Sequence, residues 1–178
     1  MEFKDLLAKR RSIRKYDARP VPQEVIERLV EATLSAPSSR NSHSTHLMVI
    51  NDPEVIGRLA EMRDYGSSFM KDAPAAIVVA GDTTTTDLWR ENCSISATVL
   101  QLAIVDAGLA SCWVHVGGRP RLKDEPEGPQ AEDFVREVVG VPAEWNIECV
   151  IALGYSDFEP KPLPEWDAES TIVWHTRE

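Results

Sequence analysis

The chain has 178 residues, 43% of them hydrophobic and 27% charged, which is an ordinary composition for one globular domain spanning residues 1–178. Its net charge of -10 argues against nucleic acid or an anionic membrane as a partner. No apolar run reaches the ~20 residues of a membrane helix, and the N-terminal segment lacks the apolar region of a signal peptide. We therefore expect a cytoplasmic protein.

Strands and helices alternate along most of the chain, as judged from hydrophobic periodicity and turn residues. In chain order, we expect helix 2–11, extended segment 16–22, helix 23–35, strand 47–50, helix 53–63, strand 75–80, helix 87–107, strand 111–116, polar loop 117–130, helix 131–139 and strand 147–153. Taken alone, this alternation favours a doubly wound parallel sheet. The glycine-rich phosphate loops of the two commonest nucleotide-binding folds are absent, however.

The C-terminal residues 156–178 differ in character from the rest. Pro160, Pro162 and Pro164 exclude helix or central strand over 156–170, and residues 170–175 are expected to form a last strand. Such an extended arm suggests that it reaches across a partner, although a chain that wraps its own surface is the alternative. Helix 87–107 is apolar nearly all round, which is typical of burial in a core or an interface.

A cluster of cations near the N-terminus is the clearest candidate site. Five of the nineteen Lys and Arg residues fall within positions 9–15 of an otherwise acidic chain. In an extended segment Arg10, Ser12 and Arg14 would face one side, with Arg11 and Ile13 on the other. Two guanidiniums and a hydroxyl suit a phosphate group. A solvated basic turn explains this feature equally well when it is considered alone.

Other candidates carry weaker signals. The polar loop after Pro37 has the composition of a binding loop or of an ordinary connection. His43 and His46 lack a third ligand nearby, so a metal site is disfavoured. The hydrolase motif Gly-x-Ser-x-Gly is absent. The three cysteines are expected to be buried, reduced thiols.

The order of four motifs is more informative than any one of them. Arg-Arg-Ser-Ile-Arg-Lys-Tyr is followed by Ala-Pro-Ser-Ser-x-Asn, by a long apolar helix ending in Gly-Leu-Ala-Ser-Cys-Trp-Val, and by Leu-Gly-Tyr before Glu-Pro-Lys-Pro. Over residues 3–165 this order resembles the FMN-dependent nitroreductase family. The resemblance implies an α+β fold, a three-layer α/β/α sandwich with a mostly antiparallel sheet. It also implies an intertwined homodimer with two FMN sites at its interface and the C-terminal arm packed on the partner.

The same resemblance implies which residues bind the cofactor. Arg10, Ser12 and Arg14 would contact phosphate, ribityl and ring atoms of FMN, and Arg11 belongs to the same basic motif. Pro37, Ser38, Ser39 and Asn41 would approach from the other subunit. The backbone of Trp113, Val114 and His115 would pass the isoalloxazine edge, and Lys161 would meet the phosphate. Family arms often carry two cations near positions 163 and 165, where this chain has Leu163 and Glu165.

The implied activity is an NAD(P)H-dependent oxidoreductase in which FMN carries the chemistry, so no catalytic side chain or metal is required. NADH or NADPH would donate hydride, and a nitroaromatic, quinone or similar small electron acceptor would then take its place in a ping-pong cycle. A cation such as Arg10 or Arg14 would stabilise the reduced flavin. Two alternatives remain: an FMN-binding sensor or carrier without turnover, and a flavin enzyme with other chemistry such as dehalogenation.

Overall fold

The computed structural model describes residues 2–165 and 167–175. Its helices and strands, including two short 3-10 helices labelled η, follow in this order: α1 (Phe3–Lys9), α2 (Gln23–Leu34), η1 (Ser39–Asn41), β1 (Thr45–Ile50), α3 (Pro53–Leu59), η2 (Ser68–Asp72), β2 (Ala75–Asp82), α4 (Trp89–Asp106), β3 (Ala110–His115), α5 (Ala131–Val139), β4 (Trp145–Gly154) and α6 (Ala168–Thr171). Within these residues no helix is both long and apolar enough to cross a membrane.

The four strands form one sheet in the order β1-β2-β4-β3, and every neighbouring pair is antiparallel. The parallel sheet favoured by simple alternation is therefore wrong, and the antiparallel α+β fold implied by the resemblance is confirmed. The misleading signal came from β2 and β4. Both are buried on both faces, so they have the continuous apolar sequence that is usual for parallel strands.

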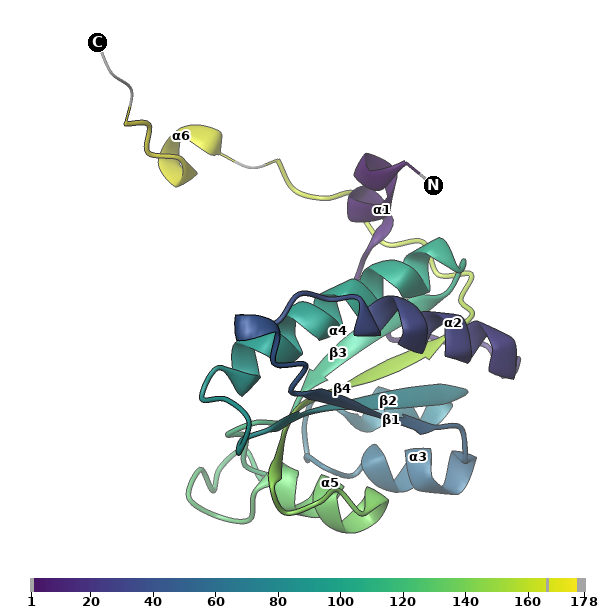
Figure 1. Ribbon diagram of the computed structural model, residues 1–178. Helices are drawn as coiled ribbons and strands as arrows, with labels where there is room; N and C mark the ends of the chain where they lie inside the picture. The colour runs from purple at the N-terminus through teal and green to yellow at the C-terminus, as the bar shows by residue number, and fades with distance from the viewer. Residues whose placement is uncertain (1, 166, 176–178) are drawn as a thin grey trace.

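Helices cover both faces of the sheet and give three layers (Figure 1). On one face, α2 and α4 pack through residues such as Leu29 and Leu100 against Ile77 of β2. On the other face, α3 and α5 pack against the neighbouring position, Val78. Successive strand residues thus enter opposite cores, which explains why their sequence shows no polar alternation.

Helix α3 begins as expected but ends early. The Asp52 carboxylate accepts a hydrogen bond from the Glu54 amide at 2.8 Å and caps the first turn. The helix was predicted to continue to about Arg63, yet it ends at Leu59. The buried Ser67 hydroxyl donates to the carbonyls of Ala60 and Arg63 and closes a turn there.

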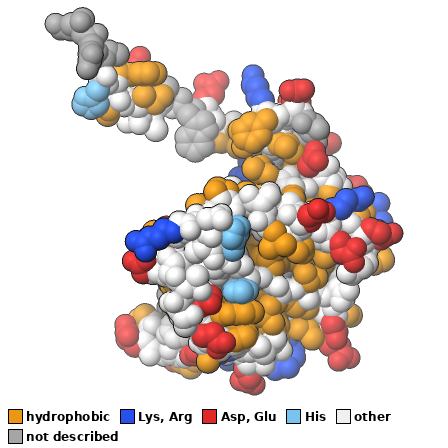
Figure 2. All heavy atoms as spheres, viewed as in Figure 1, with side chains coloured by type: hydrophobic (Ala, Val, Ile, Leu, Met, Phe, Trp, Pro, Cys, Tyr) orange, Lys and Arg blue, Asp and Glu red, His pale blue; other side chains and the backbone are white. Residues whose placement is uncertain are grey.

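The arm leaves the body of the molecule, and its end, with α6, lies apart from the sheet and its helices (Figure 1). The strand predicted over 170–175 is wrong, and so is the exclusion of helix before residue 170: Ala168–Thr171 is helical. The Asp167 carboxylate caps this turn by accepting from the Glu169 amide at 3.1 Å. Hydrophobic side chains stay exposed on the arm (Figure 2). Among them, Val173 and Trp174 are 80% and 78% exposed.

Candidate cofactor site

The basic segment lies along the edge of β3 that faces away from β4. Ser12 forms a parallel bridge with Ser111, and the Ile13 amide donates to the Ser111 carbonyl at 2.9 Å. Ile13 is buried, and its own carbonyl accepts from the Tyr16 hydroxyl at 2.7 Å. A backbone hydrogen bond and the buried side chain of Ile13 therefore both anchor the segment to the sheet.

Arg10 and Arg14 lie beside β3. Burial raises the pKa of the Cys112 thiol, and the guanidiniums of Arg14 and Arg10 oppose that rise, which places both cations near this residue. Arg14 also lies over the Phe69 ring, 5.7 Å from its centroid. Across the described part of the chain, neither arginine forms an ion pair with a carboxylate. Both are available to an anionic ligand.

Arg11 points the other way, as the alternation predicts. It lines a hollow of about 240 Å³ together with Ile13, Phe158 and Pro160, and its guanidinium donates to the Lys161 carbonyl. Lys15 lies on this side too, with its ammonium 5.2 Å from the Phe158 ring centroid. The structure thus separates Arg11 from Arg10 and Arg14 and brings it to the start of the arm, where the Lys161 side chain is exposed.

The strand β3 presents backbone groups at the same edge. Because the Ser111 carbonyl points outward to Ile13, the backbone groups of Trp113 and His115 point outward as well. The side chains of these two residues stack with centroids 6.2 Å apart, whereas Val114 points into the opposite core. The predicted segment 113–115 therefore offers main-chain donors and acceptors along an open edge.

Sequence reasoning missed two side chains at the end of β3. Arg63 donates to the His115 carbonyl at 3.1 Å and stacks over the Tyr65 ring. The buried Glu148 carboxylate lies 3.3 Å from the Arg90 guanidinium and 3.7 Å from the His115 imidazole. Burial raises the pKa of Glu148 and lowers that of His115. No local sequence signal marks either side chain, because their partners lie far away in the chain.

The loop that follows α2 lies at the other end of α4. The Ser39 amide donates to the Asn92 side chain near the start of α4, whereas Ser12 pairs just after its end. An 18-residue helix is roughly 27 Å long. One chain therefore keeps the predicted residues of this loop, namely Pro37, Ser38, Ser39 and Asn41, apart from Arg10, Ser12 and Arg14.

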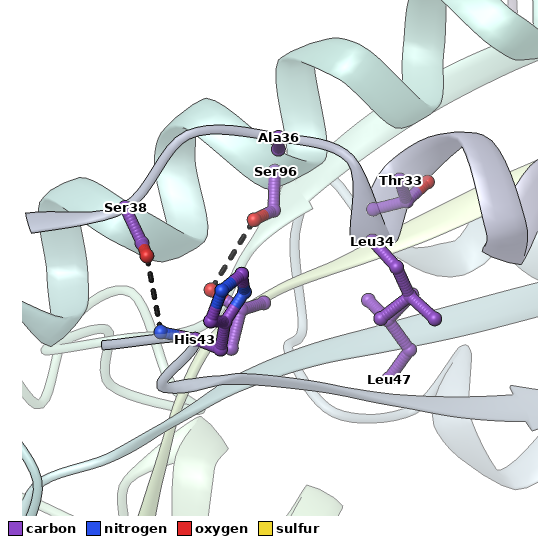
Figure 3. A pocket seen from close by; sticks show the side chains of 8 residues that line it. Thr33, Leu34, Ala36, Ser38, His43, Leu47 and Ser96 are labelled. Carbon is purple, nitrogen blue, oxygen red and sulfur yellow. Dashed lines mark hydrogen bonds between the residues drawn. The ribbon is translucent and has the colours of Figure 1, made fainter. Parts of the chain in front are cut away.

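A small pocket lies under this loop (Figure 3). Its walls come from α2, the loop, β1 and α4, and they include Thr33, Ser38, His43 and Ser96. The Ser38 hydroxyl accepts from the His43 amide at 3.0 Å. The cavity measures only about 50 Å³, far below the ~300 Å³ or more of a typical ligand site. A flavin cannot occupy it.

The remaining candidates are the histidines considered for a metal site and the three cysteines. Within residues 2–165 and 167–175, no three His, Cys, Asp or Glu side chains are grouped to hold a metal. His46 instead stacks on Trp145 at 3.8 Å between centroids. All three cysteines are free and buried, as expected, and burial raises their pKa values.

The fold is a three-layer α+β sandwich, and beside its open edge at β3 lie Arg10 and Arg14, which have no ion-pair partner among the described residues. Sequence comparison identifies the family: the chain belongs to the nitroreductase family, whose sequence model matches residues 7–65 and 55–155. A Methanothermobacter thermautotrophicus protein with the provisional name NADH dehydrogenase/NAD(P)H nitroreductase is 32% identical over 163 residues, which is 90% of this chain and 80% of that protein.

Two further relatives are similar to this chain along most of its length. The structure of an FMN-dependent nitroreductase from Clostridium difficile R20291 superposes with a TM-score of 0.87 at 36% identity, covering 97% of this chain and 98% of that one. An iodotyrosine deiodinase from Thermotoga neapolitana is 24% identical over 182 residues, which is 89% of this chain and 90% of that protein. The chain is thus a nitroreductase-family oxidoreductase.

Proposed function

We propose that this protein is an FMN-dependent oxidoreductase that takes hydride from NADH or NADPH and reduces electron-poor compounds such as nitroaromatics or quinones. One observation carries the proposal: Arg10 and Arg14 lie beside the outward-facing backbone edge of β3. Neither arginine forms an ion pair with a described carboxylate. The FMN dependence of the Clostridium difficile relative supports the choice of cofactor.

The residues present fit FMN. Arg10, Ser12 and Arg14 supply two cations and a hydroxyl for phosphate and ribityl oxygens. The outward N–H and C=O groups of Trp113 and the outward N–H of His115 suit the polar edge of a flat ring, and Trp113 adds an aromatic surface. Bound FMN would supply the hydride chemistry, and the protein would supply binding, orientation and electrostatics.

A homodimer would complete the site. In one chain the loop containing Pro37, Ser38, Ser39 and Asn41 lies at the far end of α4 from the basic segment, so a second copy is the natural source of these groups. The exposed apolar side chains of the arm supply a surface for the same contact. Lys161, at the root of the arm, would add a phosphate contact, while Leu163 and Glu165 offer none.

Reductive dehalogenation is the second candidate. It is supported by the similarity to a protein named iodotyrosine deiodinase along 89% of the chain. In this proposal both activities would use the same bound flavin, so they would differ in the acceptor and not in the cofactor site. An acceptor panel that includes halogenated phenols as well as nitroaromatics and quinones separates the two.

The testing experiment is an anaerobic titration of the purified, FMN-supplemented protein with NADH and then NADPH. We expect a flavin absorption band near ~450 nm that bleaches with at least one donor and returns when an acceptor is added. FMN binding without reduction by either donor would favour a sensor or carrier. A protein that binds no FMN would overturn the proposal.

A further inference from the structure

One buried amide holds the loop of residues 37–44. Asn92 in the first turns of α4 is only 1% exposed. Its carbonyl oxygen accepts from the Ser39 amide at 2.8 Å. Its nitrogen lies within 3.1 Å of the hydroxyls of Ser39, Ser42 and Ser44. Every hydrogen bond of this side chain within the described residues therefore goes to the same loop.

The loop needs such an anchor because its backbone is unfavourable. Arg40, Asn41 and His43 adopt positive φ angles of 51°, 54° and 47°. Residues without glycine's freedom occupy this region at an energetic cost, which the surroundings must offset. No glycine occurs in residues 37–44. Hydrogen bonds within the loop, such as the one from the His43 amide to the Ser38 hydroxyl, offset part of this cost, and Asn92 adds the contacts from outside the loop.

The anchor divides the loop into two faces. Ser39, Ser42 and Ser44 turn inward to Asn92, and Ser44 is fully buried. Pro37 and Asn41 are exposed on the outer face. The outer face is the one free to meet a cofactor bound by a second copy. Ser39, by contrast, has both its amide and its hydroxyl committed inward.

We propose that Asn92 is the positioning residue of the cofactor loop: by binding three serines on one side, it presents the opposite side, with Pro37 and Asn41, to FMN. The identity of the ligand, FMN, rests on the proposed function. The anchoring of the loop by Asn92 does not depend on that function. Asn92 touches no cofactor; it acts through the loop.

The test uses the 178-residue chain and three variants of it. Asn92→Ala removes every contact. Asn92→Asp keeps the acceptor for the Ser39 amide, and the three hydroxyls can rotate to donate to the carboxylate. The charge also lies near the positive N-terminal end of α4. Thr33→Val is the matched control, since Thr33 is equally buried and its hydroxyl bonds only within α2.

Two readouts are measured on each variant: amide hydrogen exchange at Ser39, and the dissociation constant for FMN by flavin fluorescence. We expect Asn92→Ala to raise both by about tenfold or more, as losing a well-buried hydrogen bond predicts. Asn92→Asp should restore both to within about threefold of wild type. Thr33→Val should lower thermal stability but change neither readout.

Unchanged exchange at Ser39 in Asn92→Ala would overturn the anchoring role. Equal effects in Thr33→Val would do the same, because they would reflect general destabilisation. Faster exchange with unchanged FMN affinity would overturn the link to the cofactor. Wild-type protein that binds no FMN would instead defeat the proposed function, and the exchange data would still decide whether Asn92 anchors the loop.

Discussion

The amide of Ile13 donates to the carbonyl of Ser111 at 2.9 Å, and this bond sets the orientation of the whole basic segment. It adds a short parallel stretch to the free edge of β3. With Ile13 buried beneath it, Arg10, Ser12 and Arg14 fall on one side and Arg11 and Lys15 on the other. A shift of one residue would exchange the two sets.

Arg14→Ala should weaken FMN binding by about 1.5–3 kcal/mol, or roughly 12-fold to 140-fold, because a charge-assisted contact is lost. Fluorescence titration of FMN measures the effect. The control is Arg58→Ala, which removes an exposed arginine from α3, away from β3. Equal affinities of wild type and Arg14→Ala would remove Arg14 from the site.

Gly154→Ala should destabilise the fold by about 1–3 kcal/mol through overpacking. A Cβ at Gly154 would lie 2.5 Å from the ring of Pro74 and 3.3 Å from that of Tyr16, the residue that holds Ile13. Urea unfolding measures the loss. Gly57→Ala in α3 meets no atom within 4 Å and should be stabilising by about 0.5–1 kcal/mol. A neutral Gly154→Ala would show that Pro74 can move aside.

Deleting residues 163–178 should weaken the proposed dimer by at least about tenfold, because Val173 and Trp174 are 80% and 78% exposed in the single chain and a partner could bury them. Light scattering over a dilution series gives the dissociation constant. Glu169→Gln, a change at an exposed position of α6, should leave it unaltered. A truncated protein that remains dimeric to the same dilution would confine the interface to the body.

Glu148→Gln should gain stability relative to wild type as the pH rises from 4.5 to 7. Burial raises the pKa of Glu148, although Arg90 and Ser94 oppose the shift. The folded state thus holds a proton that the unfolded chain has released, and wild-type stability falls as the pH rises through this window. The variant lacks this titration.

His115 titrates nearby: burial lowers its pKa, and the charges of Arg119, Arg90 and Arg63 lower it further. The stability that His115 contributes is lost as the pH falls below the ordinary pKa of histidine, because the unfolded chain then binds the proton first. Urea unfolding across the pH range, repeated in a His115→Gln background, separates the two groups. A stability difference that is flat with pH would mean that Glu148 stays ionised in the fold.

The helices could be predicted closely because their signals are local. The expected helix 87–107 became Trp89–Asp106, and helix 131–139 became Ala131–Val139, ended by Gly140 with φ 69°. Caps and apolar spacing act within a few residues. The end of α3 was missed because it depends on Ser67, which bonds back to Ala60 seven positions earlier.

The direction of the strands and the structure of the arm could not be predicted from such local signals. The periodicity of β2 and β4 reports burial on both faces but not the direction of the neighbouring strand. Residues 170–175 have the composition of a strand, but within the described chain they have no strand beside them to supply hydrogen bonds. The Asp167 cap therefore decides their start in favour of one helical turn.

The sequence by itself determined most of the helices and strands before the arm, the order of the family motifs and the side of the backbone on which Arg10, Ser12 and Arg14 lie. The elements and the side of the backbone follow from periodicity over a few neighbours, and the motif order is read directly along the chain. Only the tertiary structure decided the antiparallel strand order, the Arg63 and Glu148 contacts at the end of β3, and the hold of Asn92 on Ser39 across 53 residues. Such contacts join segments with independent local preferences, so their partners are chosen by packing in three dimensions.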